Sequence, residues 1–120
     1  FTRASQGAPD GSPEFSLILV GWGAGSGEAS SPLRSLIHSD GPANRGRYSN
    51  PEVDAVINEA MAAVDDDKRQ ELLAKATEMA INDGAIIPIH YQVNTWASRK
   101  GLKYIPRTDE YTVAYGVVKE

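Results

Sequence analysis

The sequence predicts a small α/β fold, in which a short mixed sheet packs against an antiparallel pair of helices. Three patterns carry this prediction: a brief apolar run at residues 15–20, two apolar stripes with helical spacing within residues 51–82, and apolar, strand-like segments after residue 85. The same element order is also compatible with an α+β layer. The chain has 120 residues, of which 41% are hydrophobic and 23% are charged, a composition typical of one folded domain.

The composition argues against several classes of protein. The formal net charge is −4 and the isoelectric point is near 5.1, which argues against a nucleic-acid-binding protein with a basic face. The chain has no cysteine, so disulfides, thiolate catalysis and cysteine-ligated metal sites are excluded. No apolar run is long enough to predict a membrane-spanning helix.

Residues 1–14 are expected to form a loose N-terminal arm. They contain several glycine and proline residues and show no apolar period. The alternatives are an irregular native connection or, at residues 11–15 (GSPEF), an expression-vector linker. Because the chain begins with Phe1 and shows neither the basic nor the apolar region of a signal peptide, we expect it to be an excised part of a longer protein.

A strand, a glycine-rich loop and a short helix are predicted after the arm, in that order. Phe15–Val20 (FSLILV) is an almost continuous apolar run, as in strands that are buried on both faces. Gly21–Gly27 (GWGAGSG) is too rich in glycine for a helix or a regular strand. Serine and proline residues then predict a short helix at residues 32–37, and a polar loop follows at residues 38–50.

Two amphipathic helices are predicted next. Asn50 and Pro51 are typical of a helix start, and the apolar stripe that follows consists of Val53, Val56, Ile57, Ala60, Met61 and Val64. The acidic run Asp65–Asp67 ends this helix and begins the next, whose stripe consists of Leu72, Leu73, Ala76, Met79 and Ala80. Asn82 and Gly84 mark its C-terminal end. Because the connection is short, we expect an antiparallel pair.

The apolar segments near the C-terminus predict strands. Ala85–Tyr91 (AIIPIHY) should lie at a sheet edge or carry a bulge, since Pro88 has no N–H group to donate to a neighbouring strand. Val93–Ala97 is expected to continue this strand, and Tyr111–Val118 alternates weakly enough to predict one last strand. The residues between these segments are expected to form a loop.

The glycine-rich loop is the most informative local feature for function. Backbone N–H groups between a strand and a helix often bind anions. The loop nevertheless lacks the glycine spacing of a dinucleotide site, the lysine of a P-loop and the glycines of a nucleophile elbow. A tight turn and a ligand-facing loop both remain open, and the alternative function is a phosphate- or nucleotide-binding enzyme that uses Gly21–Gly27. Trp22 is either a core plug, which composition favours, or a wall of a ligand pocket.

The remaining polar residues carry no catalytic or metal-binding signature. His38 and His90 are isolated in the sequence, and Asp65–Asp67 lacks the spacing of a calcium-binding loop. Arg107 and Asp109 are expected to form an exposed ion pair, which contributes little to stability. We therefore predict no catalytic residue, no metal site and no cofactor.

Four stretches, taken together and in this order, resemble the C-terminal part of a known family. They are Phe15–Leu33 (FSLILVGWGAGSGEASSPL), Tyr48–Asp54 (YSNPEVD), Asp65–Ala76 (DDDKRQELLAKA) and Ile86–Trp96 (IIPIHYQVNTW). The family is that of the extracytoplasmic solute-binding proteins of ABC transporters, in the branch that binds dipeptides and oligopeptides. The resemblance covers residues 15–120, and the order of its motifs is more specific than any single one.

The resemblance implies a non-enzymatic protein with two α/β lobes of the type II periplasmic-binding-protein fold. Such proteins close around a peptide or another small polar solute by hinge bending and deliver it to an inner-membrane ABC permease. Residues 15–120 would form part of the C-terminal lobe. The location would be periplasmic, or extracytoplasmic and membrane-anchored in a Gram-positive organism. No nucleic-acid partner is expected, and a fragment of this kind is expected to self-associate.

The resemblance also implies which residues line the ligand site. Peptide-binding members resemble this chain at Gly21 and Trp22, but they place an aspartate for the ligand's α-ammonium where this chain has Gly25, and some place a charged residue where it has Leu19. Both differences argue against an α-ammonium contact here, unless Glu28 replaces the missing carboxylate. The ligand-binding residues expected from the loop and from the cleft-lining strand are Trp22, Gly23, Gly25, Glu28, His90, Gln92 and Asn94.

Overall fold

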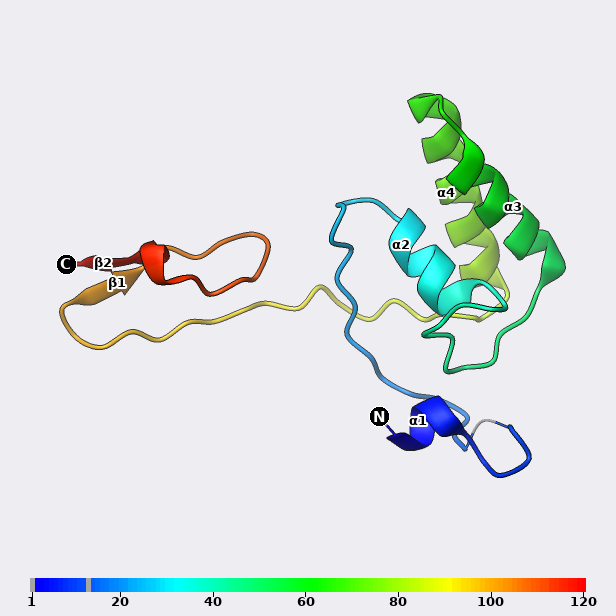
Figure 1. Ribbon diagram of the computed structural model, residues 1–120, viewed down its shortest axis with the longest axis horizontal. Helices are drawn as coiled ribbons and strands as arrows, with labels where there is room; N and C mark the ends of the chain where they lie inside the picture. Colours follow the sequence, from blue (N-terminus) through cyan, green and yellow to red (C-terminus); the bar gives the residue numbers. More distant parts are fainter. Residues whose placement is uncertain (1, 13) are drawn as a thin grey trace. The chain divides into compact units, whose positions relative to one another are not determined.

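The computed structural model describes residues 2–12 and 14–120 and divides into two compact units. The first unit is Phe1–Pro88 and the second is Ile89–Glu120. Within the described residues, all α-helices belong to the first unit and both strands to the second (Figure 1). None of these helices combines the length and the apolar character needed to cross a bilayer.

Helices dominate the first unit. Its elements, in the described residues, are α1 (Thr2–Gln6), α2 (Ser30–Pro32), the π-helical turn η1 (Leu33–Ile37), α3 (Pro51–Ala62) and α4 (Asp66–Asn82). The Asn50 side chain caps α3 by accepting hydrogen bonds from the N–H groups of Glu52 and Val53, and Asp65 caps α4 by accepting one from Lys68. Both predicted helix starts are thereby confirmed. The short helix α1 lies within the segment predicted as a loose arm.

The core of the first unit lies where α3, α4 and η1 pack together. Its buried apolar side chains are Leu33, Ile37, Val53, Ile57, Ala60, Leu72, Leu73, Ala76 and Ala80. Helices α3 and α4 run side by side in opposite directions, which confirms the predicted pair (Figure 1). The first stripe is buried only up to Ala60, because Met61 is 45% exposed and Val64, beyond the end of α3, is 95% exposed.

Two predicted strands were wrong. Residues 15–20 and 85–97 are extended, but in the described chain neither segment forms a strand ladder. Their side chains are largely exposed: Leu17 is 76% exposed and Tyr91 is fully exposed. The physical reason is that a strand exists only when another segment pairs with its backbone groups, and an apolar pattern is local information that identifies no such partner.

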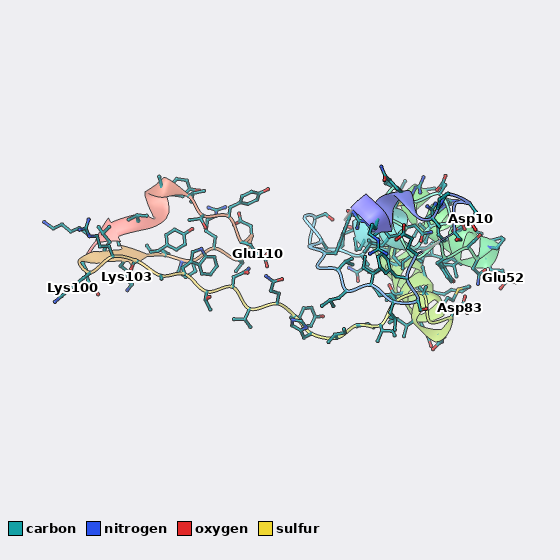
Figure 2. The ribbon with its side chains drawn as sticks, turned by 90° about the horizontal axis from the view of Figure 1, so that it is seen from below. Asp10, Glu52, Asp83, Lys100, Lys103 and Glu110 are labelled. Atoms are coloured by element: carbon teal, nitrogen blue, oxygen red, sulfur yellow. The ribbon has the colours of Figure 1, made fainter. Side chains whose placement is uncertain are left out.

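The second unit contains a two-stranded antiparallel sheet of β1 (Leu102–Tyr104) and β2 (Val117–Lys119). The 3-10 turn η2 (Ala114–Gly116) leads into β2. Strand β2 overlaps only the end of the predicted strand 111–118, and β1 lies where a loop was predicted. The sheet in the described residues is antiparallel and not mixed, because the two strands pair with each other and with no parallel neighbour. The basic Lys103, on β1, is exposed (Figure 2).

A small aromatic cluster holds the second unit together. The rings of Trp96 and Tyr104 lie 5.7 Å apart between centroids, and the Trp96 indole N–H donates a hydrogen bond to Thr112 Oγ1 at 3.0 Å. Tyr104 also packs against Gly116, where an added Cβ would lie 2.8 Å from Tyr104 Cε2. Glycine at this position is therefore required by the close approach of the ring.

Candidate ligand-binding site

The glycine-rich loop of residues 21–27 has no regular helix or strand, as predicted, and its residues are exposed. A Cβ added at Gly23 or Gly25 would meet no atom within 4 Å. Gly27 has a φ of +74° and donates a backbone hydrogen bond to the Ala24 carbonyl at 2.9 Å, which closes a turn at the end of the loop. Only Gly27 is thus required by its own backbone conformation, and the other glycines keep the loop surface open.

The Trp22 indole is 44% exposed. The prediction from composition, that it plugs the core, was therefore wrong. The reason is that the strand preceding it is not formed, so this loop does not close the end of a packed sheet. A half-exposed indole with glycine on both sides can place its flat apolar face against a ligand.

Glu28, directly after the loop, has a carboxylate whose two oxygens are both engaged. Oε1 accepts hydrogen bonds from the hydroxyl groups of Ser30 and Ser26, the latter at 3.3 Å. Oε2 accepts one from the backbone N–H of Ser30 at 3.3 Å, in the first turn of α2. The bond from the Ser30 hydroxyl is the main cause that lowers the pKa of Glu28, and burial opposes it. Glu28 therefore carries its negative charge at neutral pH.

Arg69, on α4, connects this carboxylate to the helix pair. Its Nη2 atom lies 3.5 Å from Glu28 Oε1, and its Nη1 atom donates a hydrogen bond to the Ala60 carbonyl at 3.0 Å. That carbonyl belongs to the last turn of α3 and also accepts a hydrogen bond from the Ala63 N–H at 3.3 Å. One guanidinium thus joins the end of the loop to both long helices.

A shallow groove lies between the end of the loop and one face of α4. It has a volume of about 670 Å³, and Glu28 forms part of its wall beside Leu73, Thr77 and Ile81 of α4. Trp22 is not among its lining residues. The groove and the indole are therefore distinct surfaces.

The alternative of a phosphate-binding loop finds no support in this geometry. Such a site needs free N–H groups at a helix N-terminus and a nearby cation. Here the Ser30 N–H is bonded to the Glu28 carboxylate, whose negative charge would repel a phosphate. Arg69, the cation beside it, is already paired with Glu28 and with the Ala60 carbonyl.

The other predicted site residues belong to the second unit. His90 and Gln92 are exposed, and Asn94 is half-buried. The Gln92 amide donates a hydrogen bond to Asn94 Oδ1 at 3.3 Å, so these two side chains lie on the same side of the extended backbone, as expected from their spacing. The structure brings Trp22, Gly23, Gly25 and Glu28 together in the first unit, and His90, Gln92 and Asn94 along one segment of the second.

His38 is a buried polar residue that sequence reasoning left without a role. It is 8% exposed, its Nδ1 lies 2.5 Å from Asp40 Oδ1 and 3.8 Å from Asp54 Oδ1, and its Nε2 has no hydrogen-bond partner. The Arg34 guanidinium, and to a smaller extent His38, hold the pKa of Asp40 below its usual value. Across the residues described, no group of three or more histidine, aspartate or glutamate side chains is arranged to hold a metal ion. The cluster ties the segment after η1 to α3.

A second polar cluster, which sequence reasoning missed, joins the start of α3 to the end of α4. The Tyr48 hydroxyl and the Asn50 amide each donate a hydrogen bond to Asp83 Oδ2 at 2.6 Å (Figure 2 labels Asp83). Burial, assisted by Asp83, raises the pKa of Tyr48 to about 12, and the Tyr48 hydroxyl is the main cause that lowers the pKa of Asp83. Sequence reasoning could have found this cluster, because the N-cap of the first helix and the C-cap of the second lie at the same end of an antiparallel pair, and these caps are Asn50 and Asp83.

Comparison of the sequence with known proteins finds relatives of this chain, although no family model and no solved structure matches it. The periplasmic oligopeptide-binding protein OppA of Salmonella typhimurium is 36% identical over 80 residues, 67% of this chain and 14% of that protein. The probable deoxycholate-binding periplasmic protein YgiS of Escherichia coli is 40% identical over 80 residues, 66% of the chain and 15% of that protein. Heme-binding protein A of Haemophilus influenzae is 28% identical over 107 residues, 87% of the chain and 20% of that protein.

The chain thus spans no more than one fifth of the length of these relatives. The matches nevertheless cover about two thirds of the chain or more, and the relatives are named as binding proteins. The chain belongs to the family of solute-binding proteins that includes the periplasmic oligopeptide-binding proteins.

Proposed function

We propose that the protein that carries this chain is the substrate-binding component of an ABC importer for peptides or related small polar solutes. The observation that supports it is that each relative reported above is named for a small solute that it binds: an oligopeptide, deoxycholate or heme. Its location would be periplasmic, or extracytoplasmic and membrane-anchored in a Gram-positive organism. It would act without chemical turnover and would deliver its ligand to an inner-membrane permease.

In this proposal, residues 15–120 form part of the C-terminal lobe of a type II binding protein, and residues 1–14 are an arm. The packed helix pair α3–α4 would cover one face of that lobe. The extended segments 15–20 and 85–97 carry exposed apolar side chains, as interior strands do before their neighbours are in place. A ligand held between two such lobes loses most of its contact with water on closure.

The ligand would be held by two walls. One wall is the glycine-rich loop, where Trp22 offers an apolar face and the open positions Gly23 and Gly25 let the backbone approach the ligand closely. The other wall would come from the second lobe of the protein. His90, Gln92 and Asn94 would also bind the ligand, because their side chains donate and accept the hydrogen bonds that a peptide backbone requires. Glu28 stands at the end of the first wall.

Isothermal titration of the full-length protein with peptides of two to five residues tests this function. We expect saturable binding of at least one peptide length, with a Kd on the order of micromolar. The Trp22→Ala variant should weaken binding without lowering the melting temperature, since the indole is half-exposed. Thermal-shift measurements with ATP and NAD serve as controls and should show no stabilisation. If no peptide bound, or if any ligand were chemically converted, the proposal would be contradicted.

A further inference from the structure

We propose that Glu28 is a positioning residue that fixes one end of the Trp22 loop to the helix pair, so that the loop presents only neutral groups to its ligand. The inference rests on the proposed function and adds to it a ligand class. The part of the solute that lies against Trp22 would be uncharged, as in an N-terminally blocked peptide or an amphiphile without an ammonium group at that end.

The first argument is that both oxygens of the Glu28 carboxylate already have hydrogen-bond donors. A carboxylate offers about four lone-pair positions. Ser26 and Ser30 supply two hydroxyl donors to Oε1, the Ser30 backbone N–H is bonded to Oε2, and Arg69 lies 3.5 Å from Oε1. A ligand ammonium at this carboxylate would have to compete with these donors and would lie close to the positive charge of Arg69.

The second argument is that these bonds are anchors. They begin at the end of the glycine-rich loop and lead, through Arg69, to the Ala60 carbonyl of α3, next to the buried core. The side chains of Glu28 and Arg69 are 36% and 26% exposed, so the pair is partly shielded from water. This arrangement fits a residue that holds the loop in position, so that other residues of the loop, such as Trp22, contact the ligand.

The third argument is the composition of the loop. Residues 21–27 (GWGAGSG) contain no charged side chain. An ammonium group placed against Trp22 would find there an indole face and backbone carbonyl groups, but no free carboxylate. A charge that loses water without gaining a counter-charge is disfavoured, so a neutral ligand surface fits this wall better.

The test uses the full-length protein, the tightest-binding peptide of two to five residues, and the same peptide with its N-terminus acetylated. We expect the acetylated peptide to bind as tightly as the free peptide, within about threefold, or more tightly. An acetylated form that binds more weakly by about tenfold or more would overturn the inference while leaving the proposed function intact. Failure of every peptide, free or acetylated, would overturn both.

Two variants sharpen the result. Gly25→Asp introduces a free carboxylate where a Cβ meets open space and φ is not positive, so the loop can accept it. We expect it to favour the free-amine peptide by about tenfold over the acetylated one. Glu28→Gln should weaken both peptides equally and lower the heteronuclear NOE of the loop amides. A loss confined to the free-amine peptide would show that Glu28 contacts the ligand, and the inference would be wrong.

Discussion

Ile57 is the residue whose truncation tests the helix-pair core most directly. Its side chain is 0% exposed and faces the cluster formed by α3, α4 and η1. Ile57→Ala removes the buried Cγ and Cδ carbons, and at about 0.8 kcal/mol for each carbon the lost transfer free energy is about 2.4 kcal/mol. The cavity left behind adds about 1 kcal/mol. We therefore expect the free energy of unfolding to fall by about 3–4 kcal/mol.

Urea unfolding followed by far-UV circular dichroism measures this loss. Because a small unit can unfold altogether when it loses this much, Ile57→Val provides a graded step that should cost about 1 kcal/mol. Val64→Ala is the matched surface control: Val64 belongs to the same sequence stripe but is 95% exposed, so its truncation should change stability by no more than about 0.5 kcal/mol. If Val64→Ala cost as much as Ile57→Ala, the burial argument would fail.

Four further predictions concern a helix cap, the titration of two side chains, and association. Asp65→Ala removes the cap of α4 and should cost about 1 kcal/mol in thermal unfolding, whereas Asp65→Asn should cost little. The pKa of Tyr48 is raised from 10.0 to about 12 on folding. The contribution of Tyr48 to the free energy of unfolding should therefore be complete below pH 10 and be lost between pH 10 and 12. In Tyr48→Phe this loss between pH 10 and 12 should be absent. The lowered pKa of Asp83 predicts a stability contribution above its ordinary value of 3.8 that is lost as the pH falls below it, which acid titration by circular dichroism measures. Leu17 and Leu19 are about three-quarters exposed, so light scattering should show mass rising with concentration, and serine at both positions should reduce the rise.

The two long helices, α3 and α4, could be predicted from sequence because their determinants are local. Asn50 and Asp65 cap the helices that immediately follow them, and the spacing of Val53, Ile57 and Ala60 defines a face within a few turns. The physical information that forms each helix is contained in the helix itself and in its flanking residues. The first stripe was extended too far, because the apolar pattern shows neither that Met61, inside α3, is half-exposed nor that α3 has ended before Val64.

The strands and the polar clusters could not be predicted in the same way, because their partners are distant in the sequence. Residues 15–20 have the composition of a strand, but pairing depends on another segment. The Tyr48–Asp83 bond spans 35 positions, and the Glu28–Arg69 contact joins a loop to a helix far along the chain. For the candidate site, the sequence identified the loop and Trp22, whereas only the structure shows that the Glu28 carboxylate is already engaged.

The energetics of the loop explain why one wall cannot bind alone. The Gly27–Ala24 turn and the Glu28 anchor already fix residues 24–28, so a ligand must order about three more residues, at about 1–2 kcal/mol each. Burying the exposed part of the Trp22 indole, roughly 100 Å², gains only about 2.5 kcal/mol. The ordering cost, about 3–6 kcal/mol in total, exceeds this gain, so contacts from a second wall must supply the affinity.

The 120-residue chain by itself should therefore bind peptides with a Kd above about 1 mM. An NMR titration that follows the Trp22 indole N–H measures this affinity. Saturation below about 0.1 mM would show that the loop is more rigid than its glycines indicate, and that ordering is not the dominant cost.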